Sequence, residues 1–155
     1  MIKYPGFGTA LLLAACGGAR STAPVQPANT AAGAVKSFME AVADSNVAKM
    51  ATLWGTSKGP ASRTGQPTDY ERRVAIMRAY LRNDSYRVVS EIPETESRRA
   101  VQVEIKRQTC TWNVPFVTIK TGDGSWLVNQ VDLAAAGNPA RPCVEGEQRD
   151  TTRQG

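Results

Sequence analysis

The stretch VQVEIK, residues 101–106, is the clearest half-buried strand pattern in the chain. Val101, Val103 and Ile105 fall on one side of an extended backbone, because successive side chains of a strand point to opposite faces. The alternate positions carry polar side chains. A strand with one apolar and one polar face is typical of an antiparallel sheet that is covered on one side only. We therefore expect the core to lie between such a sheet and a layer of helices.

Three more segments have the same period of two. Residues 85–93 alternate up to a proline, which predicts the end of a strand there. Residues 110–116 continue the pattern, although Pro115 cannot donate a hydrogen bond and predicts a bulge or an edge. The run TGDG at 121–124 is a hairpin signal that leads to a strand over 126–131. The sequence therefore predicts about four antiparallel strands.

Three earlier segments have the helical period instead. They are residues 31–43, a segment from residue 45 or 46 to the glycine at 55, and a segment that Thr68 or Asp69 can cap and that carries residues 70–82. The apolar side chains that recur on one face are Val35, Phe38, Met39 and Val42 in the first segment, Val47, Met50, Ala51 and Trp54 in the second, and Tyr70, Val74, Met77 and Leu81 in the third. Gly55 is placed to cap the second helix, and the glycine and proline content of 55–68 predicts a mobile loop.

Helices that precede a set of strands, rather than alternating with them, exclude a parallel sheet. The expected fold class is therefore α+β, with three N-terminal helices packed on a curved, about four-stranded antiparallel sheet. We expect this domain to span residues 31–133. Residues 134–155 turn to Ala, Gly, Pro and charged residues, which predicts a mostly irregular tail with Cys143 as its attachment point.

Charge excludes some classes of partner. The formal net charge is +5, and no run of five like charges occurs. A mild, dispersed excess of this kind suits a surface near anionic lipid or polymer better than a nucleic-acid reader. The third helical segment carries Arg72, Arg73, Arg78 and Arg82. These arginines are interpreted as a solvated face, with contact to lipid phosphate or to an acidic partner as the alternative.

The N-terminus has the pattern of an export signal. An apolar run over 10–15 ends in small residues before Cys16, and Lys3 precedes the run. The segment Leu13-Ala14-Ala15-Cys16 resembles a bacterial lipoprotein lipobox. The resemblance implies a signal peptide over 1–15, acylation of Cys16 and a flexible tether over 16–30. Glycine rather than aspartate after the cysteine implies the outer membrane, facing the periplasm. The alternative interpretation is a buried N-terminal helix with a chance cysteine.

The lipobox resemblance also bears on the cysteines. The chain has three cysteines. If Cys16 carries lipid, Cys110 and Cys143 remain and can form a disulfide in an oxidising compartment. Two separate reduced thiols are the alternative. The chain has no histidine, and two isolated thiols do not make a zinc site, so the sequence predicts no metal centre and no cofactor.

The order of the elements adds a second resemblance. Residues 31–133 are similar in element order to the cone-shaped nuclear transport factor 2-like superfamily. The similarity rests on the helix pair with its run VADSNVAKMATLWG, the Gly/Pro loop, the third helix and the final strand run SWLVNQVDL. That family implies a pocket between helices and the concave face of the sheet. Its lining would come from Phe38, Trp54, Tyr70, Val103, Trp112, Trp126 and Gln130. The alternative is that these side chains simply fill the core.

The same family includes isomerases that use a carboxylate base and a tyrosine donor. Phe38 stands near the tyrosine position, and the loop that should carry the base has no carboxylate, which leaves Asp69 or Glu104. We therefore expect a non-enzymatic envelope lipoprotein, held on a bilayer through Cys16, that binds a small apolar ligand or a protein partner and no nucleic acid. An isomerase- or dehydratase-like enzyme and a structural module of the envelope are the alternatives.

Overall fold

The computed structural model describes residues 25–141 and residue 143. The helices are α1 (Ala31–Ala43), α2 (Val47–Leu53), α3 (Ala61–Thr64), α4 (Tyr70–Leu81) and the 3-10 turn η1 (Ala134–Ala136). The strands are β1 (Gly55–Thr56), β2 (Gly59–Pro60), β3 (Ser85–Thr95), β4 (Arg98–Arg107), β5 (Cys110–Lys120) and β6 (Trp126–Val131). In the described part of the chain, no helix is long and apolar enough to cross a bilayer.

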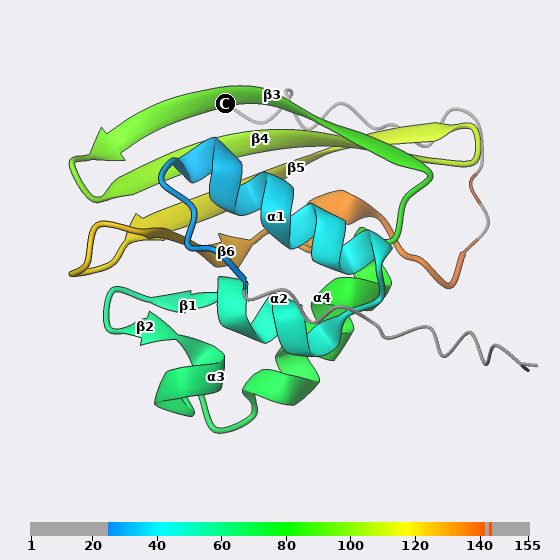
Figure 1. The fold of residues 1–155 in the computed structure, drawn as a ribbon. Coiled ribbons are helices and arrows are strands. Elements are labelled where there is room, and N and C mark those ends of the chain that lie inside the picture. The colour runs from blue at the N-terminus through cyan, green and yellow to red at the C-terminus, as the bar shows by residue number, and fades with distance from the viewer. Residues whose placement is uncertain (1–24, 142, 144–155) are drawn as a thin grey trace, which may run out of the picture.

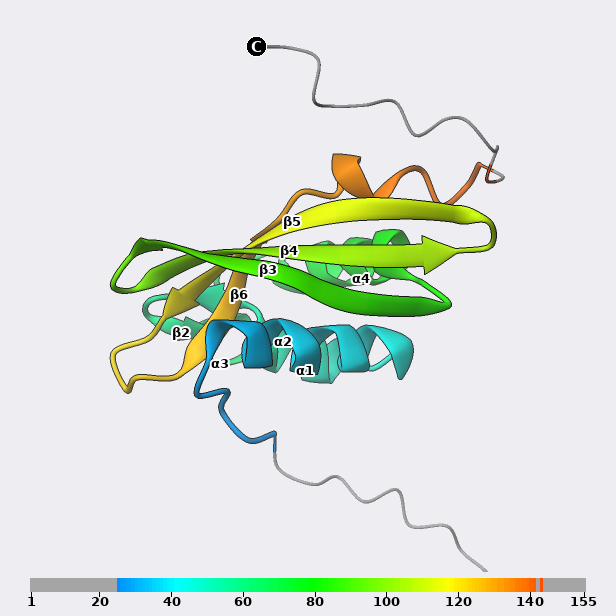
Figure 2. The ribbon, with the colours of Figure 1, turned by 90° about the horizontal axis from the view of Figure 1, so that it is seen from above.

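The large sheet is an antiparallel meander in the order β3-β4-β5-β6. Figures 1 and 2 show the sheet as one twisted layer with α1, α2 and α4 on the same face. Helix α1 contacts all four strands of this sheet. The predicted α+β class with helices against a four-stranded antiparallel sheet is therefore confirmed.

The core lies between α1 and the side of the sheet that the alternation predicts. Val101, Val103 and Ile105 of β4 are each 0% exposed. The ring of Phe38 meets the ring of Phe116 edge-on, with centroids 6.4 Å apart. Aromatic rings prefer this arrangement, because the positive edge of one ring faces the negative face of the other.

Polar side chains cap the first two helices. The Thr30 hydroxyl accepts a hydrogen bond from the Gly33 amide at 3.0 Å, and the Asn46 side chain accepts one from the Lys49 amide at 2.9 Å. Each bond satisfies a backbone donor that the helix itself leaves unpaired. Both helices therefore begin where short polar side chains precede the apolar period.

The two prolines of the large sheet occupy positions where a missing donor does little harm. Pro93 does not end β3, which continues to Thr95, because β3 is an edge strand of the sheet. The Pro115 carbonyl accepts from the Asp132 amide at 2.9 Å, just beyond the last β5–β6 pair, Phe116 with Val131. In an antiparallel strand the N and O of one residue point to the same side. The position of the missing Pro115 N–H therefore also faces β6, beyond the last β5–β6 pair, and no ladder hydrogen bond to β4 is lost.

The prediction of a loop after α2 is wrong for most of its length. Residues 55–64 form the β1–β2 hairpin and α3. Gly55 does not cap α2 in a left-handed conformation; instead, an added Cβ at Gly55 would lie 2.3 Å from the Gly59 carbonyl oxygen. The glycine therefore permits a close approach of two backbones. The Asn129 side chain holds the hairpin from β6 by donating to the Gly55 carbonyl at 2.8 Å.

Part of the segment after β6, which the sequence predicts to be an irregular tail, forms η1 and packs on the domain. Ala136 of η1 is fully buried. The Arg107 guanidinium donates to the carbonyls of Ala136 at 3.0 Å and Tyr80 at 2.8 Å, and lies 4.8 Å from the centre of a Trp112 ring. Burial lowers the pKa of Arg107. This arginine therefore joins the end of α4, the sheet and η1.

The Cys110–Cys143 disulfide is present, with a Cα–Cα distance of 5.9 Å and a sequence separation of 33. We expect Cys143→Ser to lower the free energy of unfolding by roughly 3 kcal/mol, because the unfolded chain regains loop entropy. Denaturant unfolding of the variant without reductant, beside the unchanged protein with and without reductant, measures this cost. The unchanged protein in reductant should match the variant. Equal stability in all three samples would contradict the expectation.

Candidate functional site

An open groove of about 620 Å³ lies beside the end of β6. Ligand sites for small molecules commonly fall between about 300 and 1,000 Å³. Side chains from α4, from the end of α2 and from the β5–β6 side of the sheet form its walls. The lining residues are Trp54, Pro67, Arg73, Ile76, Met77, Pro115, Val117, Asn129, Gln130, Val131, Asp132 and Leu133.

The predicted pocket residues divide between this groove and the core. Trp54 and Gln130 line the groove. Phe38, Val103 and Trp126 are instead buried in the packed core. The remaining two, Tyr70 and Trp112, pack against that core from its margin. Most of the predicted pocket residues therefore fill or border the core, as the alternative interpretation states.

A bulge in the sheet shapes one wall of the groove. Val117 pairs with Gln130 and Thr118 pairs with Val128, so Asn129 is an extra residue on β6. A bulge redirects the side chains of the strand that carries it. The Trp54 indole donates to the Asn129 carbonyl at 2.9 Å, and Trp54 also forms a parallel bridge with Val128. These contacts hold the tryptophan in place beside the groove.

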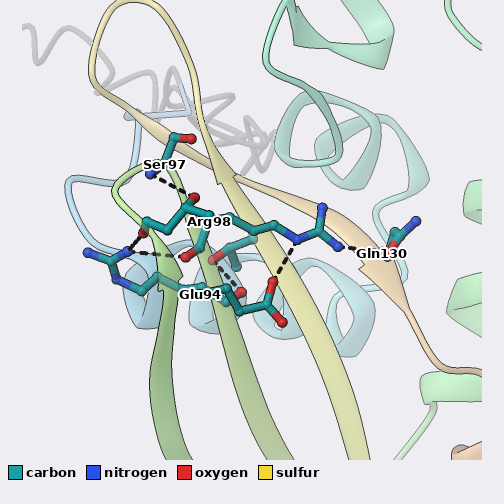
Figure 3. Close-up of polar contacts among 7 residues, drawn as sticks. Glu94, Ser97, Arg98 and Gln130 are labelled. Atoms are coloured by element: carbon teal, nitrogen blue, oxygen red, sulfur yellow. Dashed lines mark hydrogen bonds and ion pairs between the residues drawn. The ribbon is translucent and has the colours of Figure 1, made fainter.

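The lining is apolar except for a few polar groups near its rim. Arg73 pairs with Asp69 at 2.8 Å, and its side chain is 55% exposed. Asp132 accepts from the Ala135 amide at 3.3 Å. The side-chain Oε1 of Gln130 accepts from Arg98 at 3.3 Å, and Figure 3 shows Arg98 extended between Glu94 and Gln130. This arrangement suits a largely apolar molecule that is oriented by amide and guanidinium groups.

The candidate carboxylates of an isomerase lie in ion pairs. The Arg73 hydrogen bond lowers the pKa of Asp69, and the Arg87 hydrogen bond lowers the pKa of Glu104. Each carboxylate is thus held in its charged form by an arginine, which weakens it as a proton acceptor. Tyr70 lies beside Asp69 in sequence, but its hydroxyl donates to Glu71 at 3.3 Å. Neither Asp69 nor Glu104 therefore forms the pair of carboxylate base and tyrosine donor that an isomerase would need.

Sequence reasoning missed most of the lining, including Ile76, Met77, Val117 and Leu133. One signal could have indicated part of it. Ile76 lies between arginines, away from the helix face that carries Val74 and Met77, and it is 41% exposed. An exposed isoleucine on a helix flank is a weak indication of a contact surface.

Within residues 25–141 and 143, no cluster of three potential metal ligands occurs. Comparison of the chain with protein-family models, curated proteins and solved structures finds no match. Cys16, the predicted signal peptide over 1–15 and most of the predicted tether over 16–30 lie outside the described residues. Function is therefore inferred from the groove and from the surface charges.

Proposed function

We propose that this chain is an envelope lipoprotein, anchored through an acylated Cys16, whose domain binds a small and mostly apolar ligand in the groove beside β6. The observation that carries the binding role is the groove itself, with apolar walls contributed by Ile76, Val117 and Leu133. The lipobox pattern supports the anchor, and the Cys110–Cys143 disulfide is consistent with an oxidising compartment.

The size of the groove is compatible with useful affinity. A ligand that removed ~200 Å² of apolar surface from water would gain roughly 5 kcal/mol before the costs of association. The exposed guanidinium of Arg73 and the amides of Asn129 and Gln130 would then select among apolar ligands by their polar ends. The proposal is thus a binding module of modest affinity for a small amphiphile.

We further propose that the domain is a nuclear transport factor 2-like cone. The order of α1, α2 and α4 before a four-stranded meander supports this assignment. The groove lies at the outer end of β6, outside the helix-covered core that holds Phe38 and Val103. The ligand site proposed for this chain therefore differs in place from the interior pocket that the resemblance implies.

A pair of identical substitutions tests the groove. Ile76 lies in the groove and is 41% exposed, whereas Ile92 on β3 is 56% exposed and lies outside it. We expect Ile76→Gln to weaken binding of N-phenyl-1-naphthylamine, an apolar fluorescent probe, by roughly fivefold to tenfold, because about 1 kcal/mol of apolar contact is lost. Fluorescence titration measures the dissociation constant.

Ile92→Gln is the matched control and should leave probe binding unchanged. Both residues are partly exposed, so neither substitution should unfold the domain. Equal affinity of the two variants, or no saturable binding by the unchanged protein, would contradict the proposed site.

A further inference from the structure

Positive charge is concentrated in one part of the domain. We define the helical lobe as residues 46–83, which contain α2, the β1–β2 hairpin, α3 and α4. The lobe has seven basic and two acidic residues, whereas residues 85–132, which form the large sheet, have six of each. Figure 1 shows the lobe gathered beneath the sheet. The net charge of the domain therefore resides on one side of the molecule.

The lobe cations are also less neutralised than those of the sheet. Arg87, Arg98 and Arg99 of the sheet each pair with a glutamate. In the lobe, the ion pair within the described residues is Arg73 with Asp69. The other basic residues of the lobe, which make no ion pair with any described residue, are Lys49, Lys58, Arg63, Arg72, Arg78 and Arg82. Four of these six, Lys58, Arg63, Arg72 and Arg82, are exposed, whereas Lys49 and Arg78 are partly buried. Exposed cations without an ion-pair partner attract a negatively charged surface.

The chain enters the domain next to this lobe. Ala28 pairs with Trp126 on β6, and Trp54 pairs with Val128 two residues further along the same strand. A chain from Cys16 to Ala28 reaches at most about 40 Å when fully extended. A lipid on Cys16 would therefore keep the domain close to the bilayer, with the lobe near the point of attachment.

We propose that the helical lobe rests on the anionic headgroups of the bilayer to which the protein is anchored. The proposal depends on the proposed lipid anchor for proximity, and charge complementarity selects the lobe as the contacting face. Screening limits such attraction to about 8 Å at physiological salt, so the lobe must lie against the headgroups. Arg73 and Ile76 of α4 belong to both the lobe and the groove, so the groove adjoins the membrane-facing surface.

Vesicle binding by the full chain carrying Cys16→Ser tests the lobe without the anchor. The probes are vesicles of phosphatidylethanolamine with phosphatidylglycerol at about three to one, and vesicles of phosphatidylethanolamine with phosphatidylcholine. Each basic side chain at an anionic surface strengthens binding by roughly fivefold at most. We expect the anionic vesicles to bind at least about tenfold more tightly than the neutral ones, with the difference lost at high salt.

Two triple variants make the test specific to the lobe. Lys58→Gln, Arg72→Gln and Arg82→Gln remove exposed lobe cations, and Lys36→Gln, Lys106→Gln and Lys120→Gln remove exposed cations elsewhere. Both triples lose the same charge. We expect about a tenfold or greater loss of anionic-vesicle binding in the lobe triple and less than about threefold in the other.

Three outcomes would overturn the proposal: equal losses in the two triples, equal binding to both kinds of vesicle, or binding to polyglutamate without binding to anionic vesicles. The last result would assign the lobe to an acidic polypeptide instead. None of these outcomes bears on the anchor, because the tested chain cannot be acylated at residue 16; the membrane retention of the unchanged protein decides the anchor separately.

Discussion

Replacement of Cys16 by serine should move the protein from the membrane fraction to the soluble fraction. The serine hydroxyl cannot take the place of the sulfur that carries the lipid in a lipobox protein. Each buried methylene of an acyl chain contributes about 0.8 kcal/mol, so loss of two or three chains removes nearly all membrane affinity. Fractionation of cells that express the variant, followed by immunodetection, measures the change.

The control for this experiment is Cys143→Ser, which removes the Cys110–Cys143 disulfide but leaves the proposed lipobox unchanged. That variant should stay with the membranes. Any association of the Cys16→Ser protein through the basic lobe should be released by a wash with about 0.5 M salt, because screening shortens the reach of surface charges. Retention of Cys16→Ser after such a wash would contradict the anchor.

Truncation of Phe116 to alanine should lower the free energy of unfolding by about 3 to 5 kcal/mol. Phe116 is fully buried and meets Phe38 across the interface of sheet and helix. Removal of a buried phenylalanine ring loses its transfer free energy and leaves a cavity that the surroundings fill only in part. Denaturant or thermal unfolding followed by circular dichroism measures the loss.

The neighbouring residue supplies the matched control. Val117 follows Phe116 on β5, faces the other side of the sheet and is only partly buried. We expect Val117→Ala to cost less than about 1 kcal/mol, because its side chain is only partly buried and lies outside the core. Similar costs for the two substitutions would mean that the helix-covered face of the sheet has been assigned to the wrong side.

Most of the regular structure could be read from local patterns. Helices α1 and α4 and strands β3 to β6 follow from apolar periods that each segment carries within itself. The hairpin at 121–124 follows from its turn residues, and Asp123 accepts hydrogen bonds from the Ser125 amide at 3.0 Å and from its hydroxyl. These bonds lower the pKa of Asp123, because they favour the charged form of the carboxyl group.

The region after α2 could not be read in this way. Its glycines and prolines indicate a loop, but Gly55 allows two backbones to meet, and Asn129 of β6 supplies a hydrogen bond from a distant part of the chain. Local propensity contains no information about such a partner. The short strands of the hairpin therefore depend on tertiary contacts.

By itself, the sequence determined the α+β class, the helix and strand periods and the side of the sheet that is buried. The lipid anchor at Cys16 stays a prediction from the sequence. Only the tertiary structure decided that Phe38 and Val103 lie in a packed core and that the groove lies beside β6. The reason is that a period places a side chain on a face, but it does not state what covers that face. The groove is formed by Trp54, Ile76, Val117 and Leu133, which come from separate segments and meet only when the chain is folded.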